Sequence, residues 1–138
     1  MRIILLRGPS HSGKTTIIKN LYEKLRENDE KNSFYYKHIG LEKDKDFEAV
    51  ATYKGMKVAF FSAGAHKGLC LSNIIRFAWA DILILAENDK FEPILDDYNT
   101  RFSESENFSP LPHVCIKCPD AYCKKKILDA LDEVVASK

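Results

Sequence analysis

The sequence predicts a single α/β domain over residues 1–138, a three-layer sandwich around a mostly parallel sheet with one antiparallel hairpin strand. Three observations support this prediction. Short apolar runs of strand length alternate with segments whose apolar residues recur every three or four positions. Two of the strand-like runs are separated by only two residues, which is typical of a β-hairpin. The length suits one core covered by helices on both faces of a sheet, and the sequence contains no internal repeat.

Six runs are expected to form strands, because they are rich in β-branched, aromatic or long apolar residues. Residues 47–53 and 56–62 flank Lys54-Gly55 and form the expected hairpin. The run 82–85 is apolar at every position, as expected for a central parallel strand whose two faces are both covered. The predicted strands cover residues 3–6, 33–39, 47–53, 56–62, 81–86 and 113–118.

Four segments have the spacing of helices. In the first, apolar residues at 17, 18, 21, 22 and 25 share one face. In the third, Pro93 falls in the first turn, where a helix tolerates proline. The predicted helices cover residues 16–26, 69–80, 91–101 and 120–136, and residues 40–46, 63–68 and 102–112 are predicted loops.

A complete phosphate-binding motif, G-x-x-x-x-G-K-S/T, lies at residues 8–15, between the first strand and the first helix. Its glycines let the chain turn tightly and bring successive N–H groups together, and the helix adds its positive end. The motif therefore predicts that the chain binds a nucleoside triphosphate. The expected binding residues are Gly8, Pro9, Ser10, His11, Ser12, Gly13, Lys14, Thr15 and Thr16.

Three side chains at the end of this motif have individual expected roles. Lys14 can reach the β- and γ-phosphates as a point charge and is a candidate catalytic residue. Thr15 offers its hydroxyl to Mg²⁺, a cation that prefers oxygen ligands and keeps several of its waters. Thr16 is expected to contact the α-phosphate. The predicted cofactors are a nucleoside triphosphate and Mg²⁺.

Over roughly its first 26 residues the chain resembles the P-loop NTPase superfamily of kinases, GTPases and ATPases, and beyond them the resemblance is one of element order. It implies a carboxylate at the end of an apolar strand that helps to orient Mg²⁺. The GTPase branch reads guanine through Asn-Lys-x-Asp, and this sequence contains no such stretch. ATP is therefore the expected nucleotide and GTP the less expected one.

The apolar strands end differently from that pattern. Run 56–61 is followed by Ser62, whose hydroxyl can hold a metal-bound water without adding charge, and by Gly64, whose amide can face a γ-phosphate. Run 82–85 is followed by Glu87 and Asp89, which are the replacement carboxylates at this edge. The alternatives are a plain strand end and turn in the first case and solvated acids that cap a helix in the second.

Two further groups of charged residues are candidates for the site. Arg101, before the loop 102–112 that would form a lid, is the favoured cation for neutralising transition-state charge, ahead of Lys67 and Arg76; an exposed ion pair is the alternative for Arg101. Acids between residues 40 and 48 alternate with lysines, so a solvated loop is favoured there over a metal or acceptor site. These acids are Glu42, Asp44, Asp46 and Glu48.

Cys115, Cys118 and Cys123 are close enough in sequence for a zinc site completed by His113 or Cys70. Residues 113–118 read as a strand without the glycine turn that usually folds a C-x-x-C around a metal. Reduced, mostly buried thiols are therefore the favoured interpretation.

The charge balance is even, with 21 basic and 20 acidic residues, and indicates neither a nucleic-acid surface nor a membrane tether. The apolar runs are shorter than a membrane span and the chain starts directly in a strand, so a cytoplasmic protein is expected. The predicted function is a slow or regulated ATPase or nucleotide switch. The alternatives are a kinase of small molecules, nucleosides or nucleotides, and a non-enzymatic module that binds a protein partner when ATP is bound.

Overall fold

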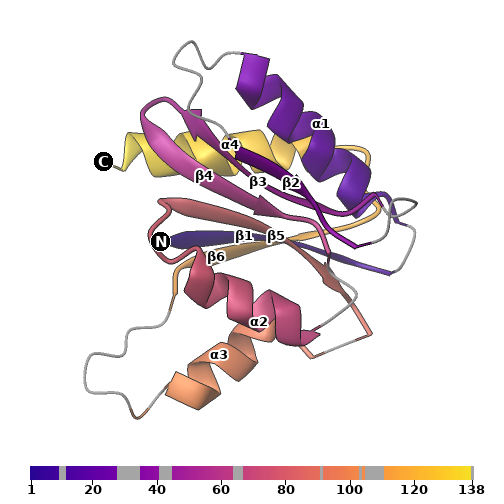
Figure 1. Ribbon diagram of the computed structural model, residues 1–138, viewed down its shortest axis with the longest axis vertical. Helices are drawn as coiled ribbons and strands as arrows, with labels where there is room; N and C mark the ends of the chain where they lie inside the picture. Colours follow the sequence, from indigo (N-terminus) through magenta and orange to yellow (C-terminus); the bar gives the residue numbers. More distant parts are fainter. Residues whose placement is uncertain are drawn as a thin grey trace.

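The computed structural model describes residues 1–9, 12–27, 35–40, 45–63, 67–90, 92–102, 104 and 111–137, and gives only the backbone at 67–71, 97, 101 and 102. Strands and helices alternate along most of the chain (Figure 1). In order, the elements are β1 (Arg2–Gly8), α1 (Lys14–Glu27), β2 (Tyr35–His38), β3 (Phe47–Tyr53), β4 (Met56–Phe61), α2 (Lys67–Arg76), β5 (Ile82–Asn88), α3 (Ile94–Phe102), β6 (His113–Lys117) and α4 (Cys123–Ala136).

The strands form one six-stranded sheet in the order β2-β3-β4-β5-β1-β6. Strands β4, β5, β1 and β6 are parallel, whereas β3 is antiparallel to both of its neighbours. Helices α1 and α4 lie on one face of the sheet and α2 and α3 on the other (Figure 1). The prediction of a mostly parallel sheet with one antiparallel strand is therefore confirmed.

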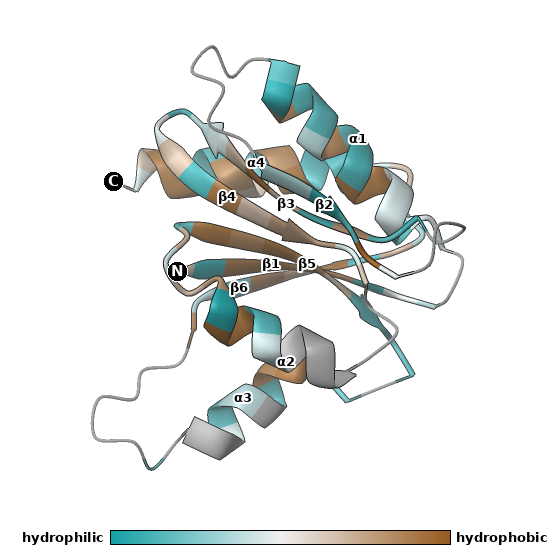
Figure 2. Ribbon diagram, in the orientation of Figure 1, coloured by the Kyte–Doolittle hydropathy of each residue, from teal (hydrophilic) through white to brown (hydrophobic). Residues whose placement is uncertain are grey.

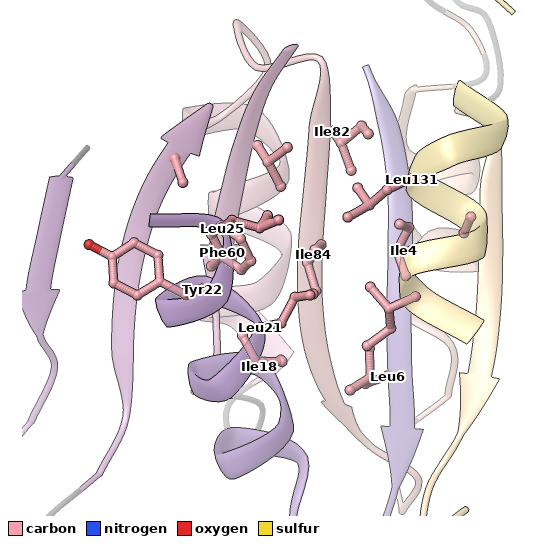
Figure 3. Packing of buried hydrophobic residues seen from close by; sticks show 14 of the residues in the cluster. Ile4, Leu6, Ile18, Leu21, Tyr22, Leu25, Phe60, Ile82, Ile84 and Leu131 are labelled. Carbon is pink, nitrogen blue, oxygen red and sulfur yellow. The ribbon is translucent and has the colours of Figure 1, made fainter. Parts of the chain in front are cut away.

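Each face of the sheet has its own hydrophobic core, because successive side chains of a strand point to opposite faces. Ile4 and Leu6 of β1 pack with Ile18 of α1 and Leu131 of α4, whereas Leu5 belongs to the core under α2 and α3. Figure 3 shows side chains of α1 and α4 directed at the strands. All of β5 is buried, and β4, β5 and β1 are the most hydrophobic part of the sheet (Figure 2), as a sheet covered on both faces requires.

Aromatic rings join α1 to β2, β3 and β4 at one side of the sheet. The Tyr22 ring of α1 lies edge-on to Phe60 of β4, with 5.6 Å between ring centroids, and 6.0 Å from the Phe47 ring of β3. Tyr36 of β2 stacks on both Tyr22 and Phe47, at 5.6 and 5.3 Å. This cluster holds β3 and the otherwise exposed β2 against α1.

The predicted hairpin is confirmed with its two-residue turn. Lys54 and Gly55 both have positive φ angles, of 47° and 83°. Two such residues form the type I′ turn, whose twist matches that of paired strands.

Several element ends differ from the sequence predictions. Strand β5 continues to Asn88, three residues beyond its apolar run of 82–85, because it pairs with β1 as far as Gly8. Helix α2 ends at Arg76 and not at residue 80: Ala78 and Ala80 donate to carbonyls three residues back, which ends the helix before β5. Helix α4 begins at Cys123 and not at residue 120, because the Asp120 carboxylate accepts the Tyr122 amide at 2.7 Å and forms a turn. Among the described residues, no helix is both long and apolar enough to cross a lipid bilayer.

Candidate functional site

The motif of residues 8–15 lies where the sheet changes winding direction. Strands β1 and β5 are adjacent and parallel, but the chain leaving β1 continues to α1 on one face and the chain leaving β5 continues to α3 on the other (Figure 1). Connections that diverge in this way open a crevice at the carboxyl ends of the strands, which is where open α/β sheets bind ligands.

The end of the loop leads straight into the first helix. Gly13 has a φ angle of +87°, and α1 begins at the next residue. The first turn of α1 contains no acidic side chain, and the Gly13 carbonyl accepts the first helical hydrogen bond, from Ile17, at 3.0 Å. The N–H groups of this first turn have no partner within the helix, as at any helix start, and are available to an anion. Ser10 and His11 lie outside the described residues, and Thr16 is exposed.

The Lys14 ammonium is turned into the loop itself. Its Nζ donates to the carbonyl oxygens of Gly8 and Pro9, both at 2.7 Å, and to Ser12 Oγ at 3.3 Å. The residue is only 9% exposed. All three acceptors are neutral, so in the described part of the chain this buried charge has dipolar partners but no carboxylate within ion-pair distance.

The electrostatics of Lys14 follow from this burial. Burial lowers the pKa of its ammonium below the ordinary 10.5, and the negative charge of Asp89 partly opposes that effect. An ammonium buried among neutral acceptors is stabilised by an anion placed beside it, because the attraction between the two charges offsets the solvation by water that burial removes. The phosphate groups of a nucleotide have that charge.

Beside the helix start, three oxygen-bearing side chains from distant segments meet. Thr15 Oγ1 donates to Asp46 Oδ1 at 3.0 Å, and Ser62 Oγ lies 3.3 Å from the same oxygen. Ser62 is 2% exposed and also accepts the Phe47 amide at 2.8 Å, which fixes its position. We refer to Thr15, Asp46 and Ser62 as the hydroxyl–carboxylate cluster. The structure thus brings together the predicted Thr15 and Ser62 and adds a carboxylate between them.

A metal role for Asp46 was the less favoured alternative in the sequence, because the family resemblance implies a carboxylate at the end of an apolar strand. Asp46 precedes β3, and β3 runs opposite to its parallel neighbours, so its start lies at the edge where β4 ends. The predicted hairpin could have indicated this position. An acid just before the antiparallel strand must lie at the edge of the sheet where the parallel strands end. The expectation that the acids of 40–48 are solvated is wrong for Glu48, which is 6% exposed and paired with Arg76; Glu42 and Asp44 lie outside the described residues.

Glu87, the predicted replacement carboxylate, has both oxygens engaged in other contacts. Oε1 accepts the Ile94 amide at 2.6 Å, at the start of α3, and Oε2 lies 3.1 Å from the Arg7 guanidinium. The side chain is almost fully buried. These contacts match the helix-capping part of the alternative, whereas the expectation of a solvated acid is wrong for Glu87, which is buried and paired with Arg7. Asp89 is exposed and tied to the loop through its amide, which donates to the Gly8 carbonyl at 3.0 Å.

Two further predicted site residues receive no test, because Gly64 and the side chain of Arg101 lie outside the described part of the structure.

The cysteines near the end of the chain form a buried thiol pair. The Sγ atoms of Cys118 and Cys123 lie 3.3 Å apart, whereas Cys115 is exposed. Burial, together with the contact to Cys123, raises the pKa of Cys118 to about 12, so this thiol stays protonated at neutral pH. Among the described residues no three His, Cys, Asp or Glu side chains are grouped as metal ligands would be. Burial is confirmed for these two cysteines and is wrong for Cys115.

Gly8 is required by the close approach of the segment after β6. A Cβ built on Gly8 would lie 2.4 Å from the backbone oxygen of Cys118, closer than any real contact. We expect Gly8→Ala to reduce the free energy of unfolding by about 1–3 kcal/mol, because backbone must move to admit one methyl group, and to weaken nucleotide binding. Urea unfolding and ATP titration would measure both effects.

The comparison variant for Gly8→Ala is Gly13→Ala. A Cβ on Gly13 meets nothing within 4 Å, but the backbone at this residue has a left-handed φ of +87°. Only conformational strain of about 1–2 kcal/mol is therefore expected. If Gly8→Ala unfolds with the same free energy as the wild type, the close approach between Gly8 and the Cys118 backbone is contradicted.

A scan against models of protein families found no match, and a search of curated proteins found none either.

Proposed function

We propose that this protein binds a nucleoside triphosphate, ATP in preference to GTP, at residues 8–16 and hydrolyses it slowly, as a nucleotide-dependent switch. The supporting features are the motif between β1 and α1, the buried ammonium of Lys14 and the first turn of α1, which contains no acidic side chain. Together they provide positive charge and N–H donors at the carboxyl edge of the sheet.

The observation that carries the proposal is the hydroxyl–carboxylate cluster beside this loop. Thr15, Asp46 and Ser62 offer two hydroxyls and one carboxylate, the hard oxygen donors that suit Mg²⁺. One or two protein ligands are enough, because Mg²⁺ usually completes its shell with waters and phosphate oxygens. The bound ion would neutralise phosphate charge, while Thr15 and Asp46 would hold it and Ser62 would orient one of its waters.

Slow turnover is expected from what surrounds the cluster. Hydrolysis needs a group that positions or deprotonates the attacking water. In the described part of the chain, Asp46 is the carboxylate next to Thr15, and Glu87 is engaged by Arg7 and the Ile94 amide. A carboxylate that serves the metal is poorly placed to act as a base as well.

The test is calorimetric titration of the protein with ATP and GTP, with and without Mg²⁺, followed by analysis of phosphate release in the same samples. Saturable ATP binding with slow phosphate release is the expected result. ATP binding without any release would remove the hydrolysis half of the proposal. Absence of binding to either nucleotide would overturn it entirely.

Replacing Asp46 with asparagine is expected to remove the Mg²⁺-dependent part of ATP affinity, about tenfold, and to leave the Mg²⁺-free affinity unchanged or improved. The reason is that the amide keeps the size and one oxygen of the carboxylate but loses the charge that attracts the cation. ATP titrations over a series of Mg²⁺ concentrations would measure the difference. Asp96→Asn, an equal change of charge at an exposed site on α3, is the matched control. Equal Mg²⁺ dependence in the two variants would exclude Asp46 as a metal ligand.

A further inference from the structure

An open pocket lies on the opposite face of the sheet from α1. It has a volume of about 450 Å³, and its floor includes Glu48 and Val50 of β3. Val50 belongs to the core that faces α2 and α3, and Tyr35 of β2 is its partner across the strands. The end of α2 and the turn that follows it form the other wall, through Arg76, Phe77 and Trp79. The volume falls within the range of small-molecule sites.

Aromatic rings dominate the walls of this cavity, which we call the α2 pocket. Trp79 is 60% exposed and Tyr35 44% exposed, although rings of this size are usually buried. The Trp79 and Phe77 rings lie 6.2 Å apart, and the Arg76 guanidinium lies 4.5 Å above the Phe77 ring. Two exposed rings facing one cavity offer stacking surfaces to a flat ligand.

The charges of the α2 pocket give it a net positive balance. Glu48 has an 8% exposed side chain and is paired with Arg76, whose own side chain remains 51% exposed. Exposed Lys57 adds a second cation to the lining. A guanidinium has five N–H donors, so its pairing with one carboxylate leaves donors for another oxyanion. Two cations against one anion favour a negatively charged ligand.

We propose that the α2 pocket binds a planar aromatic molecule that carries a phosphate or carboxylate group. The ring would stack against Trp79 and Tyr35, and the anionic group would lie between Arg76 and Lys57. Glu48 holds the Arg76 guanidinium in place, because a buried carboxylate is costly to leave without its partner. This site is separate from the phosphate loop, which leads to α1 on the other face of the sheet (Figure 1).

The test uses the fluorescence of Trp79, which is the only tryptophan in the sequence and therefore reports on this pocket alone. Titrations with AMP and with benzoate show whether the pocket prefers a phosphate or a carboxylate on the aromatic ligand. Adenosine supplies the ring without the anion, and inorganic phosphate supplies the anion without the ring. We expect saturable quenching by AMP or benzoate, with a dissociation constant at least about tenfold lower than that of adenosine or phosphate. Failure of both AMP and benzoate to quench saturably would overturn the proposal.

Variants distinguish this pocket from the phosphate loop. Lys57→Gln is expected to lower the affinity for the quenching anion about tenfold without disturbing the buried pair of Glu48 and Arg76. Arg76→Gln should weaken it further, with a circular dichroism spectrum as the check of folding. Lys14→Ala should leave the quenching curve unchanged. If Lys14→Ala abolishes quenching, the ligand occupies the phosphate loop and the α2 pocket is not its site.

Discussion

Replacing Lys14 with alanine is expected to weaken ATP binding about 100-fold, a loss of about 3 kcal/mol. The ammonium is buried among neutral acceptors, at 2.7 Å from two loop carbonyls, and is the one side-chain cation that the described residues place inside the loop. Its removal deletes the charge that compensates the phosphates and the donor that both carbonyls share. Calorimetric titration with ATP and Mg²⁺ would measure the loss.

The control for this prediction is Lys124→Ala, which removes the same charge from an exposed position on α4. Its ATP affinity should match that of the wild type, because exposed charges at a distance are screened by salt. A Lys14→Ala variant that binds ATP as tightly as Lys124→Ala, while remaining folded, would show that the motif at 8–15 does not hold the nucleotide.

The Phe60→Ala variant is expected to lose about 3–5 kcal/mol of unfolding free energy, the largest stability effect of any change considered above. Phe60 is fully buried in β4 and contacts the Tyr22 ring of α1 edge-on (Figure 3). Its truncation leaves a cavity between the sheet and α1, which a close-packed core fills only in part. Urea unfolding followed by circular dichroism measures the loss, since the exposed Trp79 is a poor reporter of this core.

Phe60→Leu is the matched variant, because it keeps most of the apolar volume and loses only the ring contact. We expect it to cost roughly 1–2 kcal/mol. Equal losses for the alanine and leucine variants would contradict the cavity explanation and point to the aromatic contact as the main source of stability.

Local patterns were sufficient to predict most of the secondary structure. The hairpin at 47–53 and 56–62 matches β3 and β4 to within one residue, because a lysine–glycine turn between two strand-like runs is a short-range signal. The helix after the phosphate motif follows from its apolar spacing in the same way. Element ends were less predictable. Strand β5 runs past its apolar stretch because its length depends on pairing with β1, a segment far away in the sequence.

The sites depended on contacts that local patterns do not contain. Thr15 and Asp46 are 31 residues apart and meet only because β3 is antiparallel within the sheet. Glu48 looked like one solvated acid among several, yet it is buried because Arg76, 28 residues later, reaches it from the end of α2. Both contacts follow from the order of strands in the sheet, and one sequence alone does not reveal that order.

The position of β1 has a consequence for synthesis. The phosphate motif leaves the ribosome well before the two strands that flank β1 in the sheet, at residues 82–88 and 113–117. Contacts so distant in sequence form late, because the intervening chain must first be made and ordered. Until then β1 has open edges that can pair with other chains. The loop is therefore synthesised well before the neighbouring strands that support it.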